Sequence, residues 1–316
     1  MTAWAHRWQI PIYLGAMFVG AVGGLVAPGI APALGTLVTP FLILLLFATF
    51  LAVPFASIGW AVRDARFLGA IVILNFVLVP GLVFVLSRFV VHDRALLLGV
   101  LLVLLTPCVD YVIVFTRLAG GDSAKLLAVS PLLMLLQLAL LPLYLGLFAG
   151  PGVIGVNHVG PFVTAFLLFI ALPLLLAALT QVLARRLPAA RSVERSMDAA
   201  MVPLLAATLA VIVGAQIDLV RANASALIAV VPVYVAFLLV APFLGILVSR
   251  VFRLHVSASR AVVFSGSTRN SLVVLPLALS LPPALALAPA AVVAQTLVEL
   301  LGMAVLVAVI PRFVRR

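Results

Sequence analysis

The sequence Thr106-Pro107-Cys108-Val109-Asp110-Tyr111 interrupts a long apolar run that extends from Leu96 to Leu118. An apolar run of this length favours a membrane-spanning helix. Proline removes a backbone donor and disturbs the preceding turn, and a carboxylate near the middle of a bilayer costs about 3 kcal/mol. In a membrane such a break is tolerated where it lines a protein-walled cavity. We therefore expect a broken helix here, with the other helices arranged around it.

The composition indicates an integral membrane protein. Hydrophobic residues make up 66% of the 316 residues and charged residues only 9%, whereas roughly a quarter of a soluble domain is charged. The net charge of +11 would suggest nucleic acid in a soluble chain, but here it follows from membrane topology, so we expect no nucleic-acid partner. The single cysteine excludes a disulfide within one chain and a Cys-rich metal cluster. We expect no cofactor.

The chain contains ten apolar runs, each near the roughly 20 residues that a bilayer requires. The first run is interpreted as a membrane span and not as a signal peptide, because a second span follows it without a polar cleavage region. We predict ten transmembrane helices, at residues 8–26, 34–55, 67–90, 96–118, 124–148, 161–183, 197–217, 225–252, 258–281 and 286–310.

The basic residues predict the orientation of these spans. With a cytoplasmic amino terminus, fifteen of the nineteen Lys and Arg residues face the cytoplasm. Only Arg88, Arg94 and Arg221 then face outside, and Arg269 lies within a span. This asymmetry is typical of the positive-inside rule. We expect a multi-pass protein of the cell (plasma) membrane with both termini in the cytoplasm and the lipid bilayer as its surroundings.

Two inverted halves are the predicted plan of the all-α fold. Residues 1–150 form a first five-helix repeat and residues 155–316 a second, inverted one, joined by a Gly- and Pro-bearing linker. In transporters, inverted repeats place the binding site where each half contributes a broken helix. The ninth span, counterpart of the fourth, contains the polar run Ser265-Gly266-Ser267-Thr268-Arg269-Asn270-Ser271. We expect broken fourth and ninth helices that cross within the membrane.

Asp110 and Arg269 are the charges at the two predicted breaks. Each would be costly alone at membrane depth, so an ion pair that holds the crossing together is one hypothesis. The alternative is functional, with Asp110 titrating and Arg269 attracting an anionic substrate.

Glu299 is a third ionisable group inside a span. It shares a helix face with Gln295, four residues earlier, and no basic residue follows it in the span before Arg312. We interpret Glu299 as a reversible proton carrier. The alternative is a protonated, hydrogen-bonded packing residue.

Cys108 has two interpretations. A cysteine in an apolar helix is usually a small buried hydrophobic residue. Its position directly after Pro107 instead places the thiol toward the predicted cavity, where a soft thiolate suits trivalent arsenic or antimony or a soft metal. One sulfur ligand, unlike three, would permit release of the metalloid.

Several of these segments, with the ten-span plan, resemble the Acr3-type arsenite efflux permeases of the bile acid/arsenite/riboflavin transporter superfamily. They are Pro107-Cys108, Gly120-Gly121-Asp122, Asn270-Ser271 and Leu297-Val298-Glu299. The resemblance, which covers essentially the whole chain, implies that Cys108 binds the substrate and that Glu299 is an essential acid. It also implies arsenite export in exchange for protons, and a core of spans three to five and eight to ten that moves against a panel of spans one, two, six and seven.

The sequence departs from related patterns at two places. Bile-acid-type sodium symporters have an acid and a glutamine where this chain has Ser265 and Arg269, and a fixed positive charge there argues against a sodium site. Asp110-Tyr111 and Thr268-Arg269-Asn270 differ from the best-known arsenite exporters and resemble a divergent branch.

The predicted function is export of trivalent arsenic, as arsenite, by a secondary transporter, with antimonite as a second candidate substrate. The alternative is an organic-anion transporter with Arg269 as its anion site. An enzyme that uses Cys108 as nucleophile is disfavoured, because all four histidines that might serve as its base lie in predicted loops or at helix ends. A passive channel is also disfavoured, because the sequence does not suggest a ring of equivalent charged side chains. Asn75 and Gln137 either line the same cavity or form helix-packing hydrogen bonds. Cys108, as metalloid ligand, is expected to be joined in the substrate site by Thr106, Asp110, Ser267, Thr268, Arg269 and Asn270.

Overall fold

The computed structural model describes residues 3–52, 64–109, 111–150, 164 and 166–315. In these residues every regular element is a helix. The longer helices are α1 (Ala3–Val26), α2 (Ala31–Ala52), α8 (Ser123–Ala149), α11 (Pro188–Ala222), α12 (Ala224–Val251) and α15 (Leu287–Phe313). The shorter ones are α4 (Ala65–Ile73), α5 (Val79–Ser87), α6 (Arg94–Leu104), α7 (Val112–Leu118), α10 (Leu172–Ala184), α13 (Val256–Ser267) and α14 (Ser271–Leu279). Two π-helical turns, η3 (Leu74–Leu78) and η6 (Leu167–Ala171), join α4 to α5 and precede α10.

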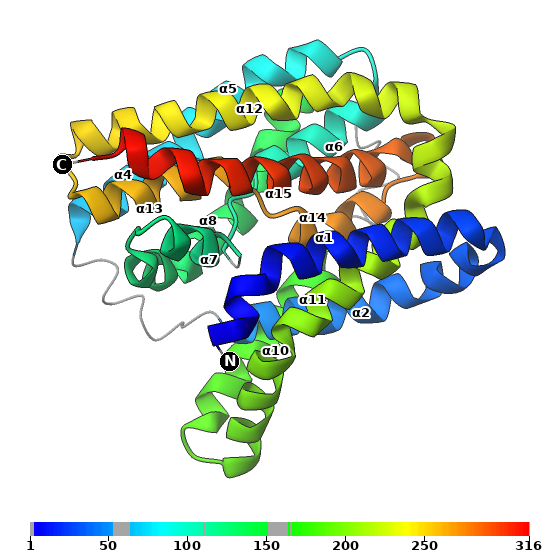
Figure 1. Cartoon of the computed structure of the whole chain (residues 1–316), viewed down its shortest axis with the longest axis horizontal. Helices are drawn as coiled ribbons and strands as arrows, with labels where there is room; N and C mark the ends of the chain where they lie inside the picture. Colours follow the sequence, from blue (N-terminus) through cyan, green and yellow to red (C-terminus); the bar gives the residue numbers. More distant parts are fainter. Residues whose placement is uncertain (1–2, 53–63, 110, 151–163, 165, 316) are drawn as a thin grey trace.

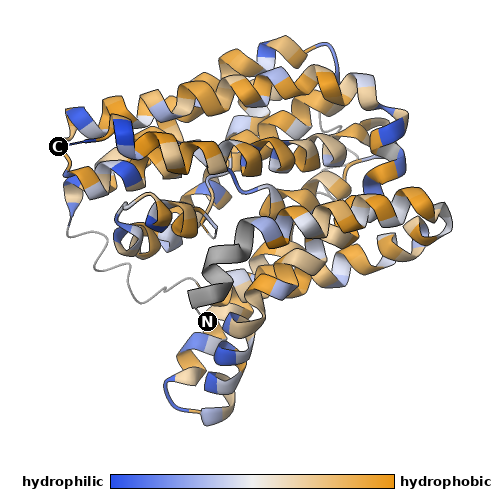
Figure 2. Cartoon of the chain, in the orientation of Figure 1, coloured by the Kyte–Doolittle hydropathy of each residue, from blue (hydrophilic) through white to orange (hydrophobic). Residues whose placement is uncertain are grey.

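The helices are those of an integral membrane protein. Seven segments of the described chain are long and apolar enough to cross a bilayer. Large apolar side chains lie exposed on these segments, among them Phe89 and Leu175, and hydrophobic residues predominate along most of the helices in Figure 2. The seven segments are Ala31–Ala52, Ala65–Val90, Ser123–Ala149, Leu167–Ala184, Pro188–Asp218, Ala224–Val251 and Pro283–Phe313.

The helices form two packing groups (Figure 1). The first packing group consists of α1, α2, α10 and α11, which pack mainly on one another. The second packing group consists of α4 to α8 and α12 to α15. Within the first group Gly20 lies directly against the backbone of Ala210, so that α1 and α11 approach more closely than a larger side chain would allow. Contacts between the groups are made mainly by α1, α2 and α11 against α14 and α15.

Several helix boundaries differ from the predicted ones. The predicted spans 96–118 and 258–281 are each divided into two helices, α6 with α7 and α13 with α14. The predicted span 197–217 is only part of α11, because the helix already begins at Pro188, where proline's fixed φ suits a first turn. The linker predicted between the two repeats falls largely outside the described residues.

The Gly120-Gly121-Asp122 motif shapes the turn between α7 and α8. Gly120 has a φ of 67°, the left-handed conformation that commonly ends a helix, and Gly121 N donates to Thr116 O at 2.8 Å. Asp122 then caps α8 by accepting from Lys125 N at 3.0 Å. The motif therefore stops one helix and starts the next.

Lys125 also links the starts of α8 and α4. Its Nζ lies 2.6 Å from Asp64 Oδ2, and this hydrogen bond lowers the pKa of Asp64. Asp64 caps α4 through Phe67 N. Because the two charged side chains are 41% and 40% exposed, the pair contributes little stability and mainly fixes the positions of the helix ends.

Candidate functional site

The two interrupted helices meet at their breaks, which lie where the sequence predicts them. Pro107, between α6 and α7, forms an antiparallel bridge with Arg269, between α13 and α14. Cys108 N donates to Thr268 O at 3.2 Å, and Asn270 N donates to Thr106 O at 2.8 Å. An exposed backbone donor or acceptor is costly in lipid, so each broken helix supplies the partners that the other lacks.

Glu299 on α15 ties both breaks together. Its Oε1 accepts from the Tyr111 hydroxyl at 2.6 Å, and its Oε2 accepts from Arg269 N at 2.9 Å and from Gln295 Nε2. The Tyr111 hydroxyl also lies 2.8 Å from Arg269 O. Glu299 is completely buried. Arg269 N and Gln295 Nε2 donate to the carboxyl group, whereas the single Tyr111 proton can be donated either to Glu299 Oε1 or to Arg269 O.

Arg269 turns its guanidinium into the protein interior. Nη2 donates to Asn75 Oδ1 at 2.8 Å, to Ser265 O at 2.6 Å and to Gly266 O at 2.9 Å. The guanidinium carbon lies 5.5 Å from the centre of the Phe237 ring, within range of a cation–π contact. Asn75 comes from the π-helical turn η3 and also donates to Ser265 Oγ at 3.0 Å. It is therefore part of the crossing and not a separate packing residue.

Three buried hydroxyls of the predicted site donate to their own helices. The hydroxyls of Thr106, Ser267 and Thr268 donate at 2.8 Å to the carbonyls of Leu102, Val263 and Phe264, respectively. Their hydrogens are thus engaged, while each oxygen keeps the capacity to accept a hydrogen bond.

Several buried polar atoms near the breaks have no hydrogen-bond partner among the described residues. They include Arg269 Nε, Asn270 Nδ2 and Gln295 Oε1. Asn270 uses its Oδ1 to cap α14, accepting from Val273 N at 3.3 Å. Unsatisfied buried polar atoms are rare in proteins and mark positions for water or a polar ligand.

Cys108 is completely buried, on the extended segment that follows Pro107. The site prediction also includes Asp110, which lies outside the described residues, so the Asp110–Arg269 ion pair stays a prediction. Gln137, on α8, is buried with its Oε1 unpartnered within the described chain.

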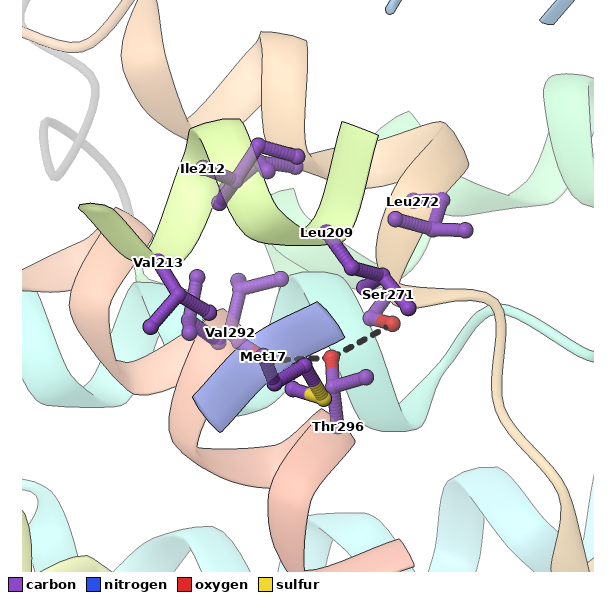
Figure 3. Close-up of a pocket in the computed structure, with 10 residues that line it drawn as sticks. Met17, Leu209, Ile212, Val213, Ser271, Leu272, Val292 and Thr296 are labelled. Carbon is purple, nitrogen blue, oxygen red and sulfur yellow. Dashed lines mark hydrogen bonds between the residues drawn. The ribbon is translucent and has the colours of Figure 1, made fainter. Parts of the chain in front are cut away.

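A small cavity of about 10 Å³ lies between the two packing groups, next to the second break (Figure 3). Met17 of α1 faces the pair Ser271 and Thr296 across it, and Thr296 Oγ1 donates to Ser271 Oγ at 2.8 Å. Cys108 is not among its lining residues. The remaining wall is apolar and consists of Leu209, Ile212, Val213, Leu272, Leu275, Val292 and Val293.

Comparison with known proteins identifies the family. The sequence model described as "Sodium Bile acid symporter family" matches residues 39–223. The chain belongs to the sodium bile acid symporter family. Since this is a family of transport proteins, the chain is a membrane transporter and not an enzyme.

The chain is also similar to the arsenical-resistance protein Acr3 of Corynebacterium glutamicum. The two are 23% identical over 274 residues, which cover 82% of this chain and 70% of the relative. The range matched by the sodium bile acid symporter family contains Cys108 and ends before α13, whereas Arg269 and Glu299 lie beyond it.

Two residues of the candidate site in this sodium bile acid symporter family member are not among those predicted from the sequence alone. No pattern in the sequence assigns a role to Tyr111, yet its hydroxyl contacts both Glu299 and the Arg269 carbonyl. Thr296 was not singled out, although it contacts Ser271. A usable signal was present for Thr296, which lies three residues before Glu299 and therefore near it on one helix face.

Proposed function

We propose that this transporter exports trivalent arsenic, as arsenite, from the cytoplasm in exchange for protons, and that it also accepts antimonite. The observation that best supports this proposal is the position of the chain's one cysteine. Cys108 lies completely buried at the meeting point of two broken helices, where its backbone nitrogen donates to Thr268 O. The similarity to an arsenical-resistance protein supports the same substrate class.

The proposed architecture has ten spans in two inverted repeats, residues 1–150 and 155–316. The broken pairs α6–α7 and α13–α14 each count as one span, as do α4–α5 and η6–α10. The first packing group then corresponds to a panel and the second to a core that moves against it. With fifteen basic residues on one side, we propose that both termini lie in the cytoplasm of a plasma-membrane protein.

The chemistry of arsenous acid, As(OH)3, suits the groups at the crossing. It is uncharged at neutral pH, so it needs hydrogen bonds more than a counter-charge. We propose that the Cys108 sulfur replaces one arsenic-bound hydroxyl, which leaves as water with the thiol proton, forming a single As–S bond. Thr106, Ser267 and Thr268 oxygens would accept from the remaining hydroxyls. Asp110, Arg269 Nε and Asn270 Nδ2 complete the proposed set, the last two as donors.

Glu299 is the proposed proton-coupling group. In the observed conformation its carboxyl group accepts from Tyr111, Arg269 N and Gln295. A protonated carboxyl group has one acceptor position fewer, so on protonation the Tyr111 hydroxyl would accept from Glu299 Oε1 and donate to Arg269 O. Since the contacts tie both breaks to α15, we propose that proton binding alters the crossing and so links proton entry to arsenite export.

The contacts of Arg269 disfavour the organic-anion alternative. Its guanidinium is completely buried and Nη2 already donates to three oxygens of the protein. An anion site would instead leave both terminal nitrogens of the guanidinium free for the substrate, whereas here Nε is the guanidinium nitrogen without a partner among the described residues. We therefore favour a neutral metalloid substrate.

The test is arsenite accumulation in everted membrane vesicles, which corresponds to efflux from cells. We expect Cys108→Ala to reduce accumulation by at least about tenfold, a loss typical of altered metal sites. Cys108→Ser is the matched variant, since it keeps the size of the side chain but replaces the soft ligand with a hard one, and it should be equally impaired. Thermal unfolding of both purified variants controls for folding. Unchanged accumulation by folded Cys108→Ala would contradict the thiol mechanism.

A further inference from the structure

The Arg269 guanidinium lies in a cage of uncharged oxygen atoms. Nη2 is 2.6 Å from Ser265 O, 2.8 Å from Asn75 Oδ1 and 2.9 Å from Gly266 O. Nη1 lies 3.4 Å from Leu104 O. The oxygens come from three separate segments, and Arg269 and Asn75 are completely buried. Such a set of carbonyl and amide oxygens is the kind of ligand shell that proteins use for hard metal cations.

Two half-helices point their carbonyl ends at this guanidinium. Leu104 is the last residue of α6, and Ser265 and Gly266 lie in the last turn of α13, which ends at Ser267. The carboxyl end of a helix bears a partial negative charge from the aligned peptide dipoles. In transporters, the carboxyl ends of interrupted helices commonly coordinate the coupling cation. The arrangement therefore favours one positive charge at this point.

Among the described residues, no acidic side chain forms an ion pair with the guanidinium. Glu299 accepts from the backbone nitrogen of Arg269 and from two other donors. Across the described parts of the chain, Lys125 with Asp64 is the ion pair present. Within the described residues, the hydrogen-bond partners of the guanidinium are therefore all uncharged oxygen atoms, as in a site for a monovalent cation.

We propose that Arg269 is a tethered cation, whose guanidinium permanently fills a monovalent-cation site at the crossing. This inference rests on the proposed function, in which protons and not sodium ions are exchanged for arsenite. A tethered cation would explain why a member of a family named for sodium symport needs no dissociable sodium or potassium ion. Removing the side chain should leave a site for a small cation. Cation binding by such a variant would depend on the oxygen atoms of the cage and not on Cys108.

The test is cation-dependent thermal unfolding of purified Arg269→Ala protein without arsenite. The protein is kept in choline chloride at constant ionic strength, and choline is replaced stepwise by millimolar guanidinium, sodium or potassium. We expect a lowered unfolding midpoint in choline and a saturable rise of at least about 3 °C with guanidinium or sodium. Wild-type protein should not respond. The proposal is equally supported if Arg269→Ala is monodisperse only when it is purified with one of these cations and aggregates when the cation is removed.

Three variants serve as controls. Arg269→Lys retains a tethered positive charge and should show no cation response. The double variant Arg269→Ala with Asn75→Leu replaces a cage oxygen by an apolar group and should lose the response. Arg260→Ala removes another arginine of α13 that donates to carbonyl oxygens, those of Ala119 and Val314, at the other end of the helix, and should not respond either.

The proposal is overturned if Arg269→Ala shows no response to any of the cations. It is also overturned if the double variant or Arg260→Ala responds equally, since the effect would then be independent of the cage. Because no arsenite is present, failure here leaves the role of Cys108 intact. Conversely, failure of the Cys108→Ala efflux test would leave the cation response of Arg269→Ala unaffected.

Discussion

Glu299 is the residue through which the two breaks are held in one arrangement. Tyr111 reaches it from the first broken helix and Arg269 N from the second, while Gln295 contacts it from its own helix, α15. Hydrogen bonds to a charged acceptor contribute roughly 1.5–3 kcal/mol each. The same carboxylate that is proposed to bind a proton is therefore also a structural support of the crossing.

Replacing Glu299 by Gln should affect both roles. The amide cannot accept at both positions, so its N–H2 group must face either the Tyr111 hydroxyl or Arg269 N. We expect a loss of about 1–3 kcal/mol in stability, the cost of an unsatisfied buried donor. We also expect arsenite accumulation in everted vesicles to become insensitive to an imposed pH gradient. Thermal unfolding and vesicle uptake at several gradients measure the two effects.

Asp198→Asn is the matched control, because it makes the same kind of change to an exposed acid on α11. It should leave both the unfolding midpoint and the gradient response unchanged. A Glu299→Gln protein that still responds to the pH gradient would rule out Glu299 as the coupling group, whatever its stability.

At the scale of elements, the breaks could be predicted from the sequence but their partners could not. Pro107 and the polar run from Ser265 to Ser271 are local signals that oppose a continuous helix. The contacts of Asn75 with Arg269, and of Tyr111 with Glu299, join residues more than 180 positions apart. Such pairings depend on how helices pack in three dimensions, and periodicity along one helix does not reveal them.

Packing of α6 against α15 positions the first break, and Gly99 makes it possible. A Cβ atom at Gly99 would lie 2.7 Å from Ala288 O and 2.8 Å from the Ala291 side chain. Since Ala288 O belongs to the backbone, α6 could accommodate the extra atom only by moving away from α15. Small residues that allow this kind of approach are typical of membrane helix interfaces.

We expect Gly99→Ala to destabilise the protein by about 1–3 kcal/mol, as overpacking usually does. Arsenite accumulation should also fall, because α6 leads directly into the break at Pro107. Gly81→Ala, on α5, is the matched control, since a Cβ atom there meets nothing within 4 Å and alanine favours a helix. If the unfolding midpoints of Gly99→Ala and Gly81→Ala did not differ, the close approach of α6 to α15 would be unimportant for stability.

At the scale of the whole molecule, the two packing groups leave Cys108 inaccessible in the observed conformation. The thiol is completely buried, and the cavity between the groups is only about 10 Å³ and does not reach it. Composition predicted a membrane protein and resemblance predicted a panel and a core, but neither indicated which conformation would be observed. The proposed export through Cys108 therefore requires the helices around the thiol to move.

The single native cysteine allows this movement to be measured without engineering. We expect a maleimide to label Cys108 slowly in the native protein, at a rate that becomes independent of reagent concentration when opening is limiting. Arsenite should slow the labelling further by occupying the sulfur. Protein denatured in SDS should react rapidly and to completion. Mass spectrometry of the intact chain measures the labelled fraction over time.

The comparison protein is the double variant Cys108→Ala with Leu118→Cys, which moves the only thiol to the end of α7. Leu118 is 50% exposed, so its replacement should react in proportion to reagent concentration and without an effect of arsenite. If native Cys108 reacted as fast as this exposed thiol, with the same dependence on reagent, the thiol would already be open to solvent. Alternating movement of the two packing groups would then be unnecessary for access, and the proposed panel-and-core mechanism would be wrong.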